Sequence, residues 1–425
     1  MSAFNRFEVV EALAGAGKTF KLSNRYLRLI VQGADPASIL ATTFSVKAAG
    51  EIRDRIIQSV ALAIDDESAR EVLFEGVPEL EKTREACVDL LRMIIADLHR
   101  LQIGTIDSFF VKTAKLFGDE LGFPTSWTIL DELREHKIFT LSIAKMLSGK
   151  QPEKIATALQ LATGSSVVPV GSTIRSIYGY AYDLIRQAGE EVWLRAGKQK
   201  ALSREEVVKA IAVLEEHGNN SEKYSKKYKA SVEKAREGDW KSWIDTGLPK
   251  CMLDGTHVFA GKPISDDIIE HFQPLYDHAA AKILNLLLDK NKGVVELMML
   301  FHDAWSSVKH AEGVYKFEDI THYLSESLVF NDVSEVAFRI DSKIDHLLVD
   351  EFQDTSMPQW NILEPLVDEI RQSDADRSLF FVGDPKQSLY GFRGGEPQLL
   401  QNLPDRLDLD GSTRLPTSWR CSPGV

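Results

Sequence analysis

Apolar runs that end abruptly in polar or charged residues recur along the chain. Leu347, Leu348 and Val349 form a run without a polar position, which predicts a strand buried on both faces of a parallel sheet. Similar runs predict strands at 7–13, 38–44, 101–106, 378–384 and 414–420. Between the early strands, helical periodicity predicts helices such as 47–64. This alternation predicts an α/β fold, in which helices flank a parallel sheet.

The middle of the chain has a different pattern. From Trp127 to Trp305 the sequence predicts long helices and gives no strong strand signal. We therefore expect a first part of the sheet domain at 1–125, an inserted helical subdomain at 126–304, and a second part of the sheet domain at 305–425. The insert contains a lysine-rich stretch in which Tyr224 and Tyr228 alternate with lysines. Such a mixture can hold a phosphate backbone, although a solvated helix face is the favoured interpretation.

Composition limits the classes of protein that fit. The chain has 425 residues, 44% of them hydrophobic, enough for a large core and about two or three domain-sized units. Fifty basic and 63 acidic residues give a net charge of -13, so any DNA site must be a local patch. Three scattered cysteines favour a reducing compartment. No signal peptide or membrane span is predicted, so we expect a cytoplasmic protein.

Histidines give no metal motif. The sequence has no HExxH pattern, and His271 and His278 flank Pro274, so we interpret them as surface or packing residues.

The first predicted strand runs into a glycine-rich loop. The segment consists of Ala14, Gly15, Ala16, Gly17, Lys18, Thr19 and Phe20. Small residues let backbone N–H groups approach phosphate oxygens, Lys18 can neutralise β/γ charge, and the Thr19 hydroxyl can ligate magnesium. The general pattern has a glycine where this chain has Ala12, so a glycine-rich turn is the alternative.

Two carboxylates follow the buried run at 347–349. Asp350 and Glu351 come at its carboxyl end, the edge where open α/β sheets bind ligands. One carboxylate can hold Mg²⁺ through water and its neighbour can polarise an attacking water. The alternative is an acidic helix start. Lys18 and Asp350 both suit a nucleoside triphosphate bound with magnesium, so the two motifs together predict binding of ATP and Mg²⁺.

Six segments resemble motifs I to IV of the UvrD/Rep group of superfamily 1 DNA helicases. They are EALAGAGKTF, TTFSVKAAGEI, IGTIDSFF, LLVDEFQDT, VGDPKQSLYGFRGGEP and LPTSWRCSP. The resemblance covers roughly 1–125 and 315–425. The wording EAxAGxGKTF, DEFQDTS and GDPKQS is similar to the RecB and AddA type, the motor subunits of recombination helicase–nuclease complexes.

The resemblance implies a RecA-like lobe and a role for each matched residue. Lys18 and Thr19 would bind phosphate and Mg²⁺, Asp350 would order the metal and Glu351 would activate water. Gln387 would sense the γ-phosphate, Arg420 would act as an in-chain arginine finger and Trp419 would stack on adenine. On the DNA side, Phe44, Tyr390 and Phe392 would stack on bases, and Lys47, Ser108 and Arg393 would contact phosphates. Val46 and Asp107 depart from the family pattern.

The implied parent activity is ATP-driven 3′ to 5′ movement on single-stranded DNA and at single-strand/duplex junctions, in DNA repair or recombination. A helicase–nuclease partner subunit would fit that activity. The chain ends just after motif IV, so we expect one lobe with weak activity of its own. The alternatives are a nucleotide-gated DNA-binding or scaffold module and another phosphate-loop enzyme, such as a nucleotide kinase.

Overall fold

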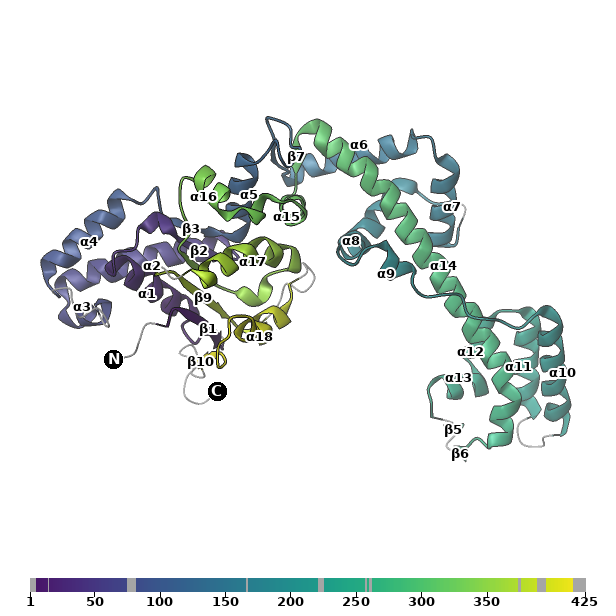
Figure 1. Cartoon of the computed structure of the whole chain (residues 1–425). Coiled ribbons are helices and arrows are strands. Elements are labelled where there is room, and N and C mark those ends of the chain that lie inside the picture. Colours follow the sequence, from purple (N-terminus) through teal and green to yellow (C-terminus); the bar gives the residue numbers. More distant parts are fainter. Residues whose placement is uncertain are drawn as a thin grey trace. The chain divides into compact units, whose positions relative to one another are not determined.

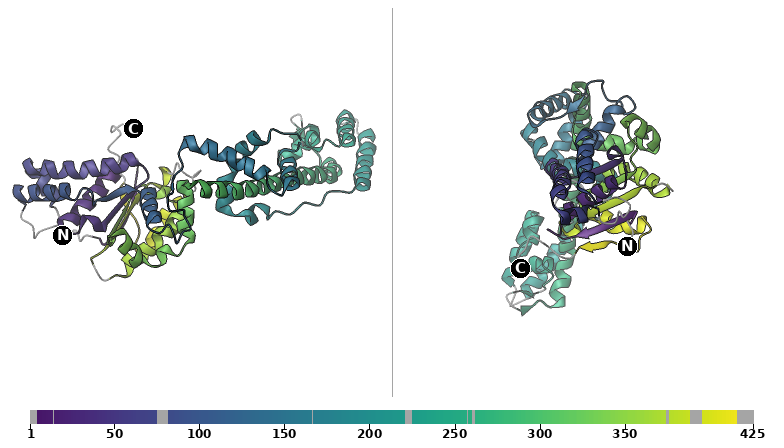
Figure 2. Two further views of the ribbon diagram at one scale, coloured as in Figure 1. Left: turned by 90° about the horizontal axis from the view of Figure 1, so that it is seen from above. Right: turned by 90° about the vertical axis from the view of Figure 1, so that its left-hand side faces the viewer.

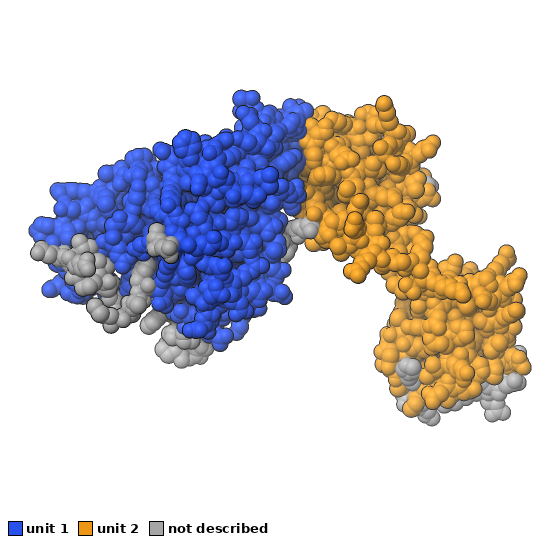
Figure 3. Space-filling view, in the orientation of Figure 1, with its two compact units in different colours: residues 1–132, 309–425 blue, residues 133–308 orange. Residues whose placement is uncertain are grey.

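The computed structural model describes residues 5–13, 15–74, 82–165, 167–220, 225–256, 258–259, 262–373, 376–387 and 395–415. The chain divides into two compact units (Figure 3). Unit 1 comprises residues 1–132 and 309–425, and unit 2 comprises residues 133–308. The expected insert at 126–304 differs from unit 2 by a few residues at each end, because Trp127 and Leu130 are buried and Trp127 packs in the core of unit 1.

A six-stranded parallel sheet forms the centre of unit 1. Its order is β10-β1-β9-β8-β2-β3. The strands are β1 (Phe7–Ala12), β2 (Ile39–Thr43), β3 (Gln102–Thr105), β8 (His346–Val349), β9 (Ser378–Gly383) and β10 (Thr413–Leu415). The α/β prediction is confirmed, with strands close to the predicted runs. β10 begins the run predicted at 414–420, and residues 416–420 lie outside the described part of the chain.

Side-chain alternation gives the sheet two buried faces. On one face Leu347 and Phe381 pack with Phe109 and Trp360 from the helices that follow β3 and β8. The other face carries a cluster that includes Leu348, Phe380, Tyr26 and Ile56. Because both faces are covered, the central strands read as continuous apolar runs. Figures 1 and 2 show helices on both sides of the sheet.

The helices of unit 1 connect these strands. They are α1 (Lys18–Val31), α2 (Val46–Asp65), α3 (Glu67–Leu73), α4 (Arg84–Ala96), α5 (Ile106–Leu116), α15 (Phe317–Glu326), α16 (Val333–Ile340), α17 (Met357–Gln372) and α18 (Pro397–Arg406). Short 3₁₀ turns at Pro36–Ser38, Val329–Asn331, Phe352–Asp354 and Pro385–Gln387 lie between them. A two-stranded parallel pair, β4 (Thr128–Ile129) with β7 (Val314–Tyr315), joins the two chain segments that lead to and from unit 2.

Unit 2 is helical. Its helices are α6 (Glu132–Leu147), α7 (Pro152–Thr163), α8 (Val170–Ala188), α9 (Glu190–Leu194), α10 (Arg204–Asn220), α11 (Ser225–Glu237), α12 (Trp240–Ile244) and α13 (Gly247–Leu253), and α14 (Asp266–Glu312) continues into unit 1. α14 runs the length of the unit, as the left-hand view of Figure 2 shows. A short antiparallel pair, β5 (Val258–Phe259) with β6 (Lys262–Pro263), precedes it.

Two clusters along α14 form the core of unit 2. Phe301 and Trp305 pack with Phe139 of α6, and Phe272 packs with Tyr228 of α11 at a ring distance of 5.1 Å. Tyr228 is only 2% exposed. The suggestion that it belongs to a surface that holds phosphate is therefore wrong, because its ring fills the bundle core. Tyr224 lies outside the described residues.

Candidate functional site

The loop after β1 adopts the backbone that its glycines predict. Gly15 has a φ of 74° and Gly17 a φ of 85°, in the left-handed region that residues with a Cβ avoid. The Ala16 N–H donates to the Leu13 carbonyl at 3.0 Å. Gly17 is the N-cap of α1 and supplies no side-chain acceptor, so the first N–H groups of the helix are available to an anion. Ala14 lies outside the described residues.

The acid pair follows β8 directly. The Asp350 N–H donates to the Thr42 carbonyl at 2.8 Å, which continues the pairing of β8 with β2. Glu351 has a φ of 52°, a left-handed conformation that is uncommon for a residue with a side chain. Its N–H donates to the Asp350 Oδ1 at 2.9 Å. The chain therefore turns sharply after the strand.

The loop and the acid pair meet at the carboxyl edge of the sheet. Lys18 Nζ lies 2.6 Å from Glu351 Oε2, with the lysine 8% exposed. Thr19 Oγ1 lies 3.5 Å from Asp350 Oδ2. These pairs join positions 333 and 331 residues apart in the sequence. The structure thus brings together the four residues for which the sequence predicted one ligand.

The negative charge of the Asp350 carboxylate is only partly compensated in this buried position. The residue is 4% exposed. Burial, with the neighbouring charge of Glu351 as the next cause, raises the pKa of Asp350 to about 6. A buried carboxylate beside a threonine hydroxyl is an oxygen donor set that suits a hard cation. The residues present therefore fit Mg²⁺ bound together with the phosphates of a nucleotide.

Sequence reasoning missed one contributor, Gln353, which links the acid pair to the end of β9. Gln353 is 0% exposed. Its Nε2 donates to Glu351 Oε2 at 2.7 Å, and its Oε1 accepts from the Asp384 N–H at 2.9 Å. The predicted sensor, Gln387, lies one turn beyond and donates through Nε2 to Asp384 Oδ2. Gln353 stands close to the acid pair in the sequence, but its partner Asp384 lies 31 residues further along the chain, so sequence proximity does not reveal the contact.

Comparison with known proteins agrees with this geometry. A model of the UvrD/REP helicase N-terminal domain matches residues 2–408. The chain belongs to this family. The resemblance stated from the motifs is confirmed, and the fold described above is the fold of this helicase domain.

Several relatives are named as ATP-dependent helicase/nuclease subunits, of the A type in each case. The protein of Streptococcus thermophilus is 25% identical over 93% of this chain and 34% of its own length. The protein of Natranaerobius thermophilus is 23% identical over 98% of this chain and 36% of its own. The similarity to the AddA type is therefore confirmed as well. The chain spans about a third of the length of the curated relatives it matches.

Three residues predicted to contact DNA lie at the same edge of the helicase domain. Phe44 follows β2 directly, and Lys47 is in the first turn of α2 with 88% of its side chain exposed. Ser108 is in the first turn of α5, where its N–H donates to Thr105 Oγ1 at 3.1 Å. Since Thr43 pairs with Thr105 in the sheet, all three follow adjacent strand ends.

The other predicted site residues divide into two groups. Phe20 lies on α1 and is 50% exposed, with the Arg55 guanidinium 5.9 Å from its ring centroid. It is therefore placed on the helix surface, on the turn that begins with Lys18. Tyr390, Phe392, Arg393, Trp419 and Arg420 lie outside the described residues.

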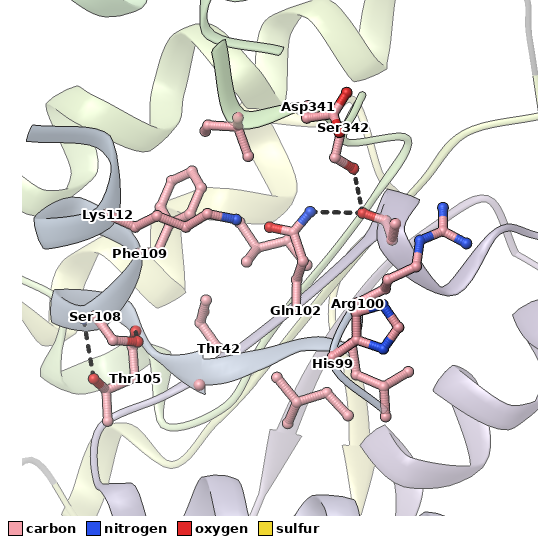
Figure 4. A pocket seen from close by; sticks show the side chains of 16 residues that line it. Thr42, His99, Arg100, Gln102, Thr105, Ser108, Phe109, Lys112, Asp341 and Ser342 are labelled. Atoms are coloured by element: carbon pink, nitrogen blue, oxygen red, sulfur yellow. Dashed lines mark hydrogen bonds between the residues drawn. The ribbon is translucent and has the colours of Figure 1, made fainter. Parts of the chain in front are cut away.

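A separate cavity of about 340 Å³ lies beside the edge strand β3 (Figure 4). Lys112 of α5 reaches into it from one side. The Gln102 amide and the Ser342 hydroxyl both donate to the Ala37 carbonyl, at 2.6 and 2.5 Å. Through the Ala37 carbonyl, these hydrogen bonds connect β3 to the segment between α16 and β8. The Gln102 amide and the Ser342 hydroxyl in the cavity wall are therefore already hydrogen-bonded.

No helix of the described residues is long and apolar enough to cross a membrane. In the same part of the chain no group of three or more His, Cys, Asp or Glu side chains could hold a metal ion. His278 is 3% exposed and its Nδ1 accepts from the Leu202 N–H at 3.0 Å. His271 stacks on His217 at a ring distance of 3.5 Å. Both histidines are packed against other residues, as the sequence predicted.

Proposed function

We propose that this chain is the ATP-binding lobe of a DNA helicase of the helicase/nuclease type. It binds ATP with Mg²⁺ at the carboxyl edge of the sheet, and within the whole polypeptide it contributes to ATP-driven 3′ to 5′ movement on single-stranded DNA. The single observation that carries the proposal is the contact between Lys18 and Glu351 at 2.6 Å. It joins the phosphate loop and the acid pair at one point, as hydrolysis of a nucleoside triphosphate requires.

Each residue of the edge has a distinct role in this proposal. The N–H groups of the loop and of α1 bind phosphate oxygens, and Lys18 exchanges Glu351 for the β/γ-phosphates. Thr19 and Asp350 hold the cation, which when bound neutralises charge that develops on the phosphates. Glu351 then accepts the proton of the water that attacks the γ-phosphorus. Gln387, Arg420 and Trp419 complete the nucleotide site in the roles that the motifs imply.

DNA binding belongs to the neighbouring strand ends. Phe44 offers a ring on which any base can stack, and Lys47 and Ser108 offer phosphate contacts beside it. Tyr390, Phe392 and Arg393 are proposed for the same strand of DNA. The relatives are named as helicase/nuclease subunits, which supports a role in DNA repair or recombination together with a partner subunit.

Nucleotide binding by the 425-residue chain tests the first part of the proposal. A fluorescent ATP analogue should bind in the presence of Mg²⁺, and Lys18→Ala should weaken binding at least tenfold because the triphosphate loses its cation. Lys115→Ala is the matched control, since Lys115 is exposed on α5 away from the edge. Equal affinities for the two variants would contradict the proposed nucleotide site.

Hydrolysis by the whole polypeptide that the gene encodes tests the second part. Glu351→Gln should leave ATP affinity close to normal and reduce single-stranded-DNA-stimulated hydrolysis by about 10² or more, because the proton acceptor is lost. A parallel loss of binding would mean that Glu351 shapes the pocket instead. Phe44→Ala should weaken binding of single-stranded DNA by about one stacking contact, ~1–3 kcal/mol, with ATP affinity unchanged.

A further inference from the structure

Gln353 links the two strand ends that frame the proposed site. Its side chain is fully buried, at 0% exposure, between the turn after β8 and the end of β9. Its Nε2 donates to Glu351 Oε2 at 2.7 Å and to Asp354 Oδ2 at 3.3 Å, and its Oε1 accepts from the Asp384 N–H at 2.9 Å. A single side chain therefore connects the proposed proton acceptor to the segment that carries Gln387.

The chemistry of the partners determines the orientation of this amide. The Asp384 N–H can only donate, so it needs the amide oxygen. An ionised Glu351 carboxylate can only accept, so it needs the amide nitrogen. If the Gln353 amide were flipped, its oxygen would face the Glu351 carboxylate and its NH₂ group would face the Asp384 N–H. Both of these pairs are repulsive. The arrangement is specific to a side chain that carries one donor and one acceptor at this reach.

Gly383 provides the space for this contact. A Cβ at Gly383 would lie 2.4 Å from Gln353 Oε1 and 3.2 Å from Gln353 N. Both distances are shorter than ordinary van der Waals contact. Because β9 ends in a residue without a side chain, the amide can lie directly against its backbone.

Glu351 receives two donors on the same oxygen. Lys18 Nζ and Gln353 Nε2 both contact Oε2, at 2.6 and 2.7 Å. Within the described part of the chain Oε1 accepts no hydrogen bond. When Lys18 turns to the phosphates, as in the proposed function, Gln353 is the donor that remains on Glu351. It then determines how the carboxylate is oriented.

We propose that Gln353 is a positioning residue for hydrolysis: it holds one oxygen of Glu351 so that the other can take the proton of water, and it transmits the position of Asp384 and Gln387 to that carboxylate. The inference rests on the proposed function. In the step itself, the water oxygen forms a bond to the γ-phosphorus and the bond from phosphorus to the β-phosphate bridging oxygen breaks. ADP leaves with that electron pair, and the proton of the water passes to Glu351.

Two substitutions separate the contacts of the Gln353 amide nitrogen from that of its oxygen. Gln353→Glu keeps an acceptor for the Asp384 N–H and removes the donor to Glu351 and Asp354. Gln353→Met has a similar volume and removes all of these contacts. Gln372→Glu, at the exposed end of α17, makes the same chemical change away from the site. Each variant is measured in the whole polypeptide for ATP affinity with a fluorescent analogue, single-turnover hydrolysis with saturating single-stranded DNA, and thermal midpoint.

The expected result is a split between binding and chemistry. Gln353→Glu and Gln353→Met should both lower the hydrolysis rate by about 10- to 100-fold, while ATP affinity changes less than about threefold. Gln353→Glu should lower the thermal midpoint, because a buried carboxyl group would face the carboxylates of Glu351 and Asp354. Gln372→Glu should match the unsubstituted protein in all three measurements.

The remaining outcomes contradict the inference in distinguishable ways. Full hydrolysis by either Gln353 variant would overturn the inference and leave the proposed function intact. A loss of ATP affinity as large as the loss of rate would make Gln353 a part of the pocket wall. A rate loss in Gln353→Met alone would mean that the contact with Asp384, rather than Glu351, matters. Absence of hydrolysis in the unsubstituted polypeptide would end the proposed function and the inference together.

Discussion

The close contact between α7 and α14 makes a sharp prediction for unit 2. Gly293 of α14 faces the backbone of α7, and a Cβ there would lie 2.5 Å from Ala162 N, 2.6 Å from Leu161 Cβ and 2.7 Å from Ala158 O. Two of these atoms belong to the backbone, so a rotamer change cannot relieve the overlap. Gly293→Ala should therefore force the helices apart by about 1 Å, since ordinary contacts are ~3.5–4 Å.

Two opposing terms determine the size of the effect. Overpacking of this kind costs about 1–3 kcal/mol, and a clash with backbone belongs at the upper end of that range. Replacing glycine by alanine inside a helix contributes about 1 kcal/mol in the stabilising direction. Gly179→Ala isolates the second term, because Gly179 is exposed on α8 and its Cβ would meet nothing within 4 Å. The two variants should differ by about 2–3 kcal/mol.

The assay must report on unit 2 alone, because a chain with two units need not unfold in one step. Hydrogen exchange followed in increasing urea on peptides from α7 and α14 gives the local free energy of opening. Gly293→Ala should lower that free energy and Gly179→Ala should raise it slightly. Equal values for the two variants would refute the close approach of α7 to Gly293.

Three further predictions concern unit 1. Lys309 and Asp319 form a buried pair at 2.5 Å, 3% and 6% exposed, so Lys309→Met should cost about 3–5 kcal/mol in urea unfolding. Lys82→Met, from a pair with Glu71 in unit 1 that is 37% and 62% exposed, should cost less than about 1 kcal/mol. Burial lowers the pKa of His346, although the charge of Asp345 acts to raise it. Below about pH 6.5 the unfolded state therefore binds more protons than the folded state, and the free energy of unfolding should decrease as the pH falls. The thermal midpoint should fall less steeply with decreasing pH for His346→Asn than for the unsubstituted protein. Equal slopes would contradict the assignment. Lys47→Ala should reduce the slope of log affinity for single-stranded DNA against log salt by about 0.7–1, measured by fluorescence anisotropy, and an unchanged slope would exclude a phosphate contact.

The sequence predicted the sheet and most of its edge because these features are local. A run such as 347–349 is apolar on both faces only when the strand is central, and β8 lies inside the sheet. Gly15 and Gly17 predicted the turn into α1 because only glycine adopts its backbone readily. Parallel strands present their carboxyl ends at one edge, so the meeting of Lys18 with Glu351 also followed from the pattern.

Other features depend on partners that are distant in sequence. Pro274 lies in the helical part of unit 2, where a proline lacks an N–H donor and crowds the preceding turn. The structure has one helix, Asp266–Glu312, that passes through it. Phe272 and Leu275, both 0% exposed, anchor the helix in the bundle on either side of the proline. Periodicity alone cannot show that tertiary packing outweighs the lost backbone hydrogen bond.

Strand order explains why the site needs Gln353 and Gly383, two residues of the matched motifs to which the sequence analysis assigned no role. β9 lies between β1 and β8, so the phosphate loop and the acid pair are separated by a whole strand, about 10 Å for two strand spacings. Lys18 spans that gap with its long side chain. The end of β9 must lie within the gap, and any side chain there would meet the amide of Gln353. The strand order and the buried Gln353 together therefore require a glycine at position 383. A side chain at this end of β9 would occupy the space of the Gln353 amide, which connects the end of β9 to the acid pair.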